Sequence, residues 1–236
     1  MIKIIESKAM TPEAIMAFDT ALLEECDPEG KPLLHFYEWS VPSLTYGYFT
    51  DPAKHLNLEA LKQHLISPAR RPTGGGIIFH LCDFAFSIVI PANHPRFSLN
   101  TLKNYEWINT FTAEAIAQFS NHALHPKLFS PQPSYQSNCT SFCMANPTQF
   151  DLILKGKKVG GSAQRKTKRG LLHQGSISLQ FPSKTLLLDV LKKGPAIVNA
   201  MEENSYCLLP DSATTEEFLN AKAQLKNYLS DQFLNA

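Results

Sequence analysis

The sequence predicts an α/β (α+β) protein in which helices pack against a mixed β-sheet. Apolar residues recur at helical spacing over residues 11–25 and 100–119. Runs rich in β-branched and aromatic residues lie between and after these segments, such as FAFSIVIP at 84–91. The chain has 236 residues, 44% of them hydrophobic and 18% charged, and no linker or repeat divides it. We therefore expect a single domain over residues 1–236.

Capping residues mark the ends of the expected helices. Thr11 stands before Pro12, the order expected of an N-cap followed by the first helical position. The sequence TTEE at 214–217 predicts a capping box for the last helix. The four helices expected from apolar spacing and caps span residues 11–25, 57–66, 100–119 and 215–233.

The expected strands are short β-rich runs. They span residues 33–39, 43–49, 76–80, 84–91, 150–161 and 171–179. A short turn containing proline joins the first two, and a connection broken by glycines joins the last two. Residues 125–147 are rich in Pro, Ser and Asn and predict a long surface loop, a kind of segment that often carries function.

Composition excludes several classes of function. The net charge is +1, so no global field attracts nucleic acid or a membrane, and no apolar run reaches the roughly 18 residues of a membrane span. The N-terminus lacks a signal-peptide pattern. Five cysteines without a C-x-x-C pair indicate reduced thiols rather than disulfides or a zinc site. We expect a cytoplasmic monomer without a metal site and without nucleic-acid or membrane partners.

The sequence ARRPTGGGIIFH at 69–80 places three consecutive glycines beside two arginines, in a chain with 11 glycines. Successive glycine amides form a concave donor site for a phosphate or carboxylate. The pattern matches neither the Walker loop nor the dinucleotide-binding turn. A tight hairpin is the structural alternative. The glycines lie at the start of an expected strand, a position from which their amides can contact an anion.

A second glycine pair lies in KGKKVGGSAQRKTKRGLLHQG at 155–175, a segment with seven cations and no acid. A solvated hairpin or a nucleic-acid patch is the simpler interpretation, since charge runs are usually solvated. No aromatic residue interleaves the run, which disfavours single-stranded nucleic acid. The small and hydrogen-bonding residues among the cations instead suit close approach to a ligand. We expect ligand contacts from Gly161, Ser162, Ala163 and Gln164.

The two motifs together resemble the family of lipoate–protein ligase A and octanoyltransferases, which is related to biotin ligases. The resemblance rests on RRPTGGGIIFH followed by Ser87, then KVGGSAQR and LHQGSISL, with MAFDTALLE and YEWSVPSLTYGYF upstream. It covers most of residues 11–180. It implies a catalytic domain like those of biotin ligases and class II aminoacyl-tRNA synthetases. Many ligases also have a C-terminal accessory domain, and we expect none here, because 236 residues leave no room for one.

The resemblance also implies partners. Members attach lipoate or octanoate to one lysine of the lipoyl domains of 2-oxoacid dehydrogenases or of the glycine-cleavage carrier. In the ligases, the matching residues contact ATP or the acyl-adenylate: Arg71, Gly76, Ile77, Ile78, Phe79 and Lys158.

The same positions make physical sense as a site for acyl transfer. The amides of Gly74, Gly75 and Gly76 with Arg71 are suited to hold an anion, and Lys158 is suited to stabilise an oxyanion, an effect worth about 3 kcal/mol per donor. The apolar run 77–79 has two interpretations. It lines a slot for an eight-carbon chain, at roughly 0.8 kcal/mol per buried CH₂, or it is ordinary strand core, which periodicity alone favours.

Two chemistries remain open. A ligase activates the free acid with ATP and Mg²⁺, and Gly76 favours it, since related cysteine-dependent octanoyltransferases typically have arginine there. A transferase needs no cofactor and takes octanoyl from acyl carrier protein onto a cysteine, and Cys143 in the long loop favours it. We expect the ATP-dependent ligase, with the Cys143 transferase as the alternative. Cys143 as a small buried hydrophobe is the structural alternative, and Cys139 has less support.

The remaining expectations concern pocket polarity. Thr73 and Gln164 are expected to donate hydrogen bonds to the substrate, and His80 and His173 to line the pocket or to serve structure. Asp151 is expected to orient Lys158 or to bind a metal. A third reading is an inactive relative that only binds an acyl group or a lipoyl domain, because Leu81 replaces the aspartate that usually follows the motif's histidine. Asp83 is a candidate substitute.

Overall fold

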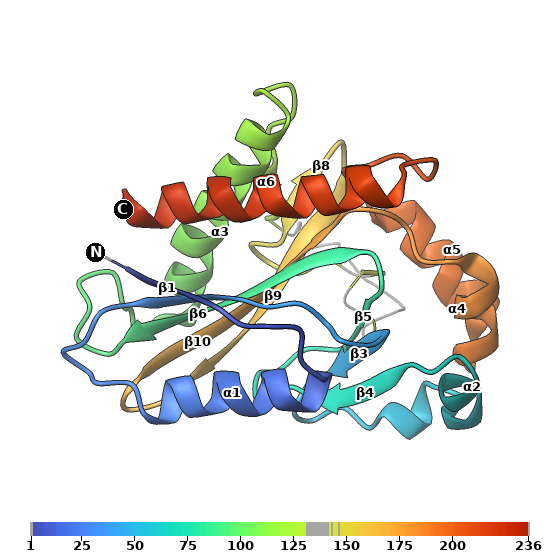
Figure 1. Ribbon diagram of the computed structural model, residues 1–236, viewed down its shortest axis with the longest axis horizontal. Coiled ribbons are helices and arrows are strands. Elements are labelled where there is room, and N and C mark those ends of the chain that lie inside the picture. Colours follow the sequence, from blue (N-terminus) through green and yellow to red (C-terminus); the bar gives the residue numbers. More distant parts are fainter. Residues whose placement is uncertain (1, 131–141, 143, 146, 236) are drawn as a thin grey trace.

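A seven-stranded mixed sheet forms the centre of the computed structural model, which describes residues 2–130, 142, 144–145 and 147–235. The first two strands of the sheet run parallel and its other neighbours are antiparallel. In order across the sheet, its strands are β1 (Lys3–Glu6), β2 (Leu33–Phe36), β6 (Asp83–Pro91), β10 (Gly170–Ser178), β9 (Lys157–Lys166), β8 (Leu152–Leu154) and β7 (Lys127–Leu128). Figure 1 shows the long strands β6, β9 and β10 side by side.

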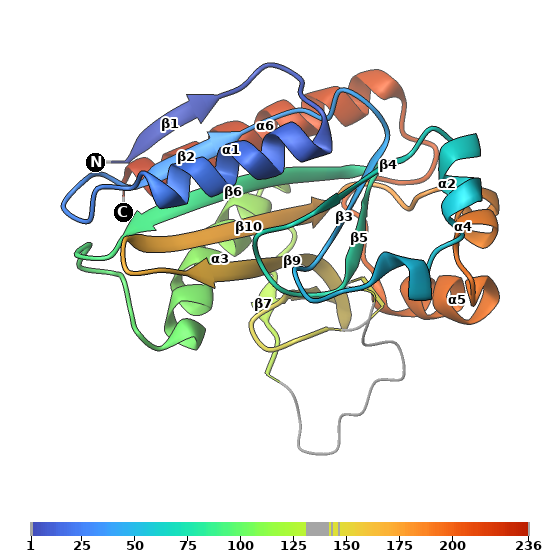
Figure 2. The ribbon, with the colours of Figure 1, turned by 90° about the horizontal axis from the view of Figure 1, so that it is seen from below.

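A second sheet of three strands crosses one end of the first, as Figure 2 shows. Its strands are β4 (Ser67–Arg70), β3 (Ser43–Tyr46) and β5 (Ile77–His80). The two strands expected at 33–39 and 43–49 are both present, but they belong to different sheets. The turn between them therefore moves the chain from the main sheet to the small one, and the space between the sheets becomes available for a site.

Three long helices cover the main sheet: α1 (Pro12–Glu24), α3 (Thr101–Phe119) and α6 (Thr215–Leu234). α1 lies on one face, and α3 and α6 lie on the other (Figure 1). Strand β6 supplies both cores because its side chains alternate. The residues Phe84, Phe86, Ile88 and Ile90 pack with α3 and α6, whereas Ala85 and Val89 pack beneath α1.

The predicted caps are present. Thr11 Oγ1 accepts from the Ala14 amide at 3.3 Å, and Thr214 and Glu217 form the capping box of α6. The expected helix at 57–66 is the shorter α2 (Leu58–Gln63). Strand β4 and three helical elements near the small sheet were not expected: the 3₁₀ turn Pro52–Lys54, α4 (Lys184–Val190) and α5 (Gly194–Asn204). None of the described helices is long and apolar enough to cross a membrane.

The second glycine pair is not a turn, contrary to the prediction of a glycine-broken connection. Gly160 and Gly161 lie inside β9 and pair with Ile177 and Ser176 of β10. Glycine is needed here for steric reasons, because a Cβ on Gly160 would lie 3.1 Å from the carbonyl oxygen of Ser176 on the neighbouring strand. The pair therefore lets strands and side chains approach one another, and its amides do not form an anion-binding turn.

Candidate active site

A cavity of about 260 Å³ opens between the small sheet and strands β9 and β10. Both motifs of the sequence reach it, so the two segments do converge. From the first motif it is lined by Arg71, Gly75, Gly76, Ile78 and His80, and from the second by Lys158, Gly161, Ser162 and Ala163. Cations, backbone and apolar side chains thus surround one space.

Lys158 supplies a buried cation to the cavity. Its side chain is 3% exposed, and its Nζ lies 2.6 Å from Oδ2 of Asp151, which is equally buried. The same carboxylate oxygen accepts from the amide and the hydroxyl of Thr148. Asp151 therefore orients Lys158, one of the two roles expected of it. An amine held between a carboxylate and an open cavity is placed to stabilise charge that develops there.

Gly161 creates the room for that amine. A Cβ at this position would lie 2.5 Å from Cε and 2.7 Å from Nζ of Lys158. Real Cβ atoms do not approach so closely, so any larger residue would move the ammonium group. Gly161 thus contributes to the cavity wall by having no side chain, which leaves space for the Lys158 amine.

Arg71 shapes the first glycine loop from inside. Its guanidinium donates to the carbonyl oxygens of Gly74 and Gly76, at 3.1 and 2.8 Å, and to Oγ1 of Thr45 at 2.8 Å. Gly75 between these carbonyls has φ of +91°, which favours glycine. Two carbonyl oxygens of the loop thus face Arg71. The guanidinium holds the loop in shape, and the same residue lines the cavity.

Alternation along β5 separates the apolar run into two roles. Ile78 lines the cavity, whereas Ile77 and Phe79 point into the hydrophobic core around α2, α4 and α5. Strand core is therefore the correct interpretation for Ile77 and Phe79, and Ile78 alone of the three lines the cavity. The rest of the apolar wall was not expected from the sequence and comes from Met16, Tyr37, Trp39, Phe142 and Met144.

His80 is the centre of a hydrogen-bond chain along the cavity wall. Its Nε2 lies 2.8 Å from Oγ1 of Thr45, and its Nδ1 lies 2.7 Å from Oδ2 of Asp83. The Asp83 oxygen also accepts from Ser176 Oγ at 2.6 Å. Arg71 donates to the same Thr45 oxygen, so the two side chains meet at this hydroxyl. Asp83 thus provides the histidine with a carboxylate in this chain.

A second buried network, centred on Asp19, lies under the cavity. Its carboxylate accepts from Ser87 Oγ at 2.6 Å, from Gln174 Nε2 at 2.7 Å, and lies 2.9 Å from Nδ1 of His35. Burial raises the pKa of the neighbouring Tyr37 well above its usual value, and the charge of Asp19 adds to this shift. The phenol in the cavity wall is therefore neutral. Helical spacing marks Asp19 as inward-facing, but its partners on β2, β6 and β10 are visible only in the fold.

Besides Ile77 and Phe79, four more expected contacts do not line the cavity. Thr73 is fully buried and donates to Oε1 of Gln174, and Gly74 lies just outside the wall. His173 lies on the α3 side of β10 between Phe86 and Tyr105, and Gln164 Nε2 lies 2.9 Å from its Nδ1. Burial lowers the pKa of His173 to about 3. Side chains of neighbouring residues on a strand point to opposite faces, so Gln174 reaches the cavity and His173 cannot.

Cys143 and Cys139 lie outside the residues that the structure describes. The neighbours of Cys143 in the chain, Phe142 and Met144, both line the cavity, and Phe142 forms a backbone bridge with Ile77. The described thiols are Cys26, Cys82 and Cys207, and none of them lines the cavity. Burial raises the pKa of Cys82 and of Cys207 to about 11, so both remain thiols at neutral pH. Within the described part of the chain, no cluster of His, Cys, Asp and Glu could hold a metal ion.

The family model of the lipoyl protein ligase A/B catalytic domain matches residues 11–221. The chain belongs to this family. Octanoyltransferase LipM of Geobacillus kaustophilus is 32% identical over 188 residues, which cover 78% of this chain and 67% of that protein. The LipM of Bacillus subtilis is 30% identical over 209 residues, covering 86% and 74%. The chain thus spans about two thirds to three quarters of these relatives.

Solved structures of lipoate ligases share the fold of this family member. A bipartite lipoate protein ligase from Thermoplasma acidophilum, from a study that includes its E2 lipoyl domain, superposes with a TM-score of 0.71 at 21% identity, covering 98% of this chain and 83% of that one. A lipoate-protein ligase A bound with ATP gives 0.67 at 22% identity, with 98% and 84% covered. The expected mixed sheet with packed helices is therefore confirmed.

Proposed function

We propose that this member of the lipoyl protein ligase A/B family is an octanoyltransferase, which moves a medium-chain acyl group from a thioester donor to a lysine of a lipoyl domain through Cys143. This reverses the order expected from Gly76 and from the cations concentrated around Lys158. The observation that carries the proposal is the shared cavity, in which the buried ammonium of Lys158 faces the glycine loop beside an apolar wall. The relatives named octanoyltransferase support this choice over the ligase.

The proposed reaction has two steps. The thiolate of Cys143 attacks the donor's thioester carbonyl, and the donor leaves as a thiol after taking up a proton. The neutral amine of the acceptor lysine then attacks the enzyme thioester, an amide forms, and the Cys143 sulfur leaves and regains a proton. Both steps pass through an oxyanion. Lys158, which lines the cavity, is the donor that we assign to it.

Three features of the cavity match this chemistry. A cation stabilises a thiolate as well as an oxyanion, and Lys158 provides one. Ile78, Met16 and Trp39 provide an apolar surface for the acyl chain. The chain on both sides of Cys143 lies at the cavity, through Phe142 and Met144.

The ATP-dependent ligase is the second candidate, and Gly76 is the residue that favours it. In that case ATP and Mg²⁺ are co-substrates, the acid is activated as an adenylate, and Arg71 with the glycine loop lies beside the phosphate. The same acceptor lysine would then attack a carbonyl near Lys158. The two candidates differ in whether ATP is consumed and whether the enzyme becomes acylated.

The test is to incubate the protein with octanoyl-carrier protein, weigh the intact enzyme, and then add an apo lipoyl domain. We expect an octanoyl adduct without ATP, which is lost in Cys143→Ser and kept in the matched Cys82→Ser variant. Lys158→Ala should slow acylation by about 10² to 10³, the usual cost of removing an oxyanion donor. Lys157→Ala is its control, since that side chain bonds the Glu202 carbonyl outside the cavity.

Release of pyrophosphate from lipoate and Mg-ATP, with acylation of the lipoyl domain by Cys143→Ser, would replace the proposal by the ligase. Binding of an acyl group without any transfer would identify an inactive relative.

A further inference from the structure

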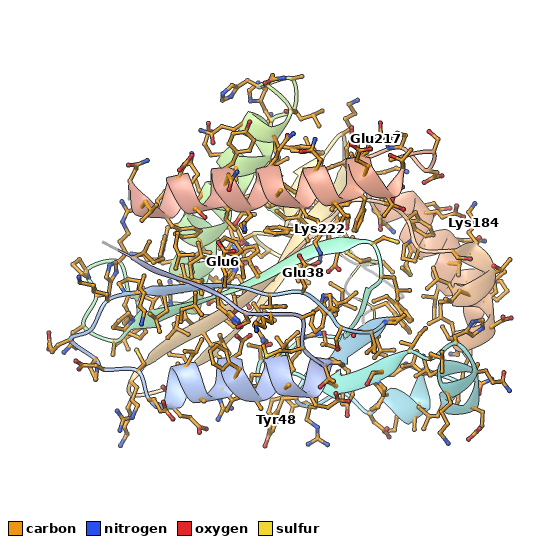
Figure 3. The ribbon with its side chains drawn as sticks, in the orientation of Figure 1. Glu6, Glu38, Tyr48, Lys184, Glu217 and Lys222 are labelled. Atoms are coloured by element: carbon orange, nitrogen blue, oxygen red, sulfur yellow. The ribbon has the colours of Figure 1, made fainter. Side chains whose placement is uncertain are left out.

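Two exposed aromatic side chains precede Thr50, which lines the cavity. Phe49 is 92% exposed, more than any other large apolar residue in the described part of the chain, and Tyr48 beside it is 50% exposed. Their rings meet edge to face at 5.1 Å. Figure 3 shows Tyr48 pointing outward, away from the sheet. Single exposed apolar residues are common, but aromatic pairs are typical of the centres of protein interfaces.

The loop that carries this pair is bonded to the glycine loop. The Tyr48 amide donates to the Thr73 carbonyl at 2.9 Å, and Thr50 Oγ1 donates to the Gly75 carbonyl at the same distance. A Cβ on Gly47 would lie 1.9 Å from the Gly75 oxygen, so the two backbones are in direct contact. Thr50 itself lines the cavity. The aromatic pair is therefore held in one position next to the site.

Arginines lie next to the aromatic pair. The exposed Arg70 places its guanidinium 5.9 Å from the centre of the Tyr48 ring. Tyr48 and Arg70 line one wall of an open groove of about 500 Å³, together with Arg165, and this groove shares Met16 and Arg71 with the cavity.

Helix α1 also lines the groove. It carries Glu13 and Glu24, and Glu13 accepts from Ser67 of β4. Arg70 is the charge that contacts the Tyr48 ring, and the exposed Asp51, two residues after Phe49, caps the turn Pro52–Lys54.

We propose that Tyr48, Phe49, Arg70 and Arg165, here called the mouth surface, dock the protein that delivers the acyl group, an acyl carrier with an acidic surface. This inference rests on the proposed function. A donor that carries its acyl thioester on a flexible arm must hold its body at the rim while the arm enters. A rigid aromatic anchor beside arginines provides apolar contact and charge complementarity to an acidic body.

The test compares a protein donor with a small one. Enzyme acylation is followed by intact mass with octanoyl-carrier protein and with octanoyl-N-acetylcysteamine, which has the same thioester and no protein body. Phe49→Ser and Arg70→Glu should each raise the KM for the carrier about tenfold or more and leave acylation by the small thioester unchanged. The Arg70→Glu effect should shrink at high salt.

Two matched variants control for general effects of the substitutions. Leu219→Ser changes an apolar residue that is 58% exposed on α6, on the other side of the sheet from α1. Lys103→Glu reverses an exposed charge on α3. Both should keep the KM of the wild type for the carrier.

Three results would overturn the docking proposal. The first is an unchanged KM for the carrier in both mouth variants. The second is an equal loss with the small thioester. The third is a defect confined to the second step, the transfer from octanoyl-enzyme to the lipoyl domain, which would assign the surface to the acceptor. A wild-type enzyme that no thioester acylates would instead refute the proposed function itself.

Discussion

The two glycine clusters of this chain have similar sequences and different physical roles. In the first, Gly75 supplies a backbone conformation, with φ of +91°, in a loop whose carbonyls Arg71 holds. In the second, Gly160 and Gly161 have ordinary strand geometry and supply empty volume. Both clusters reach the same cavity, so the pattern of glycine beside cations led to one shared space. It did not tell which property of glycine each position uses.

The largest effect expected from this difference is on Gly161. Gly161→Ala should lower the acyl-transfer rate by about 10- to 100-fold, because the new Cβ displaces the Lys158 ammonium, and a displacement of about 1 Å can cost 10²-fold. The free energy of unfolding should also fall, because the new Cβ would lie 2.9 Å from Oδ1 of Asp151, the buried ion-pair partner of Lys158. Single-turnover kinetics and urea unfolding measure the two quantities.

Gly160→Ala is the matched control in the same strand. Its Cβ meets the Ser176 carbonyl at 3.1 Å rather than Lys158, so the rate should stay near that of the wild type. Equal rates for the two alanine variants would show that Gly161 does not make room for the reactive amine.

The next effect is on the stability of the first cluster, where Gly75 has a backbone conformation that favours glycine. Gly75→Ala should destabilise the protein by about 1 to 2 kcal/mol, since alanine is strained at positive φ. Gly74→Ala should be within about 0.5 kcal/mol of the wild type, because its Cβ would have no neighbour within 4 Å. Thermal and urea unfolding of the two variants provide the comparison. A neutral Gly75→Ala would refute the conformational role.

The effect that is smallest at neutral pH, and grows only in acid, concerns the strand that pairs with the second cluster. The pKa of His173 is lowered by burial from 6.5 to about 3 in the folded protein. Between these pH values the unfolded chain binds a proton that the folded chain does not. The free energy of unfolding should therefore fall as pH falls from 6.5 toward 3, by up to about 1.4 kcal/mol per pH unit from this group.

His173→Phe should flatten this pH dependence, because the new ring fills the space between Phe86 and Tyr105 without a titrating group. His122→Phe, an exposed substitution, should keep the slope of the wild type. An unchanged slope in His173→Phe, measured by urea unfolding across this range, would show that the site is wetter than its burial indicates.

Local signals predicted most of the fold. Thr11 and the capping box at 214–217 marked helix starts correctly, since a cap satisfies amides within four residues of itself. β1, β4, α4 and α5 were missed, because they are short or lack strong periodicity and depend on packing. For the site, spacing placed Lys158 on a strand. It could not separate Gln174 from His173, since that requires knowing which face of β10 turns toward the cavity.

The sequence by itself determined the family, the mixed sheet with packed helices and the two motifs that meet in the cavity. Those properties follow from residue types at short spacing, where neighbours in the chain are neighbours in space. The tertiary structure alone decided which side chains line the cavity, the ion pair of Lys158 with Asp151, and the attachment of the Tyr48–Phe49 loop to the glycine loop. These features depend on contacts between segments that lie far apart in the sequence and meet only in the folded chain. A small displacement at such a contact can move a reactive group out of position, although the composition stays the same.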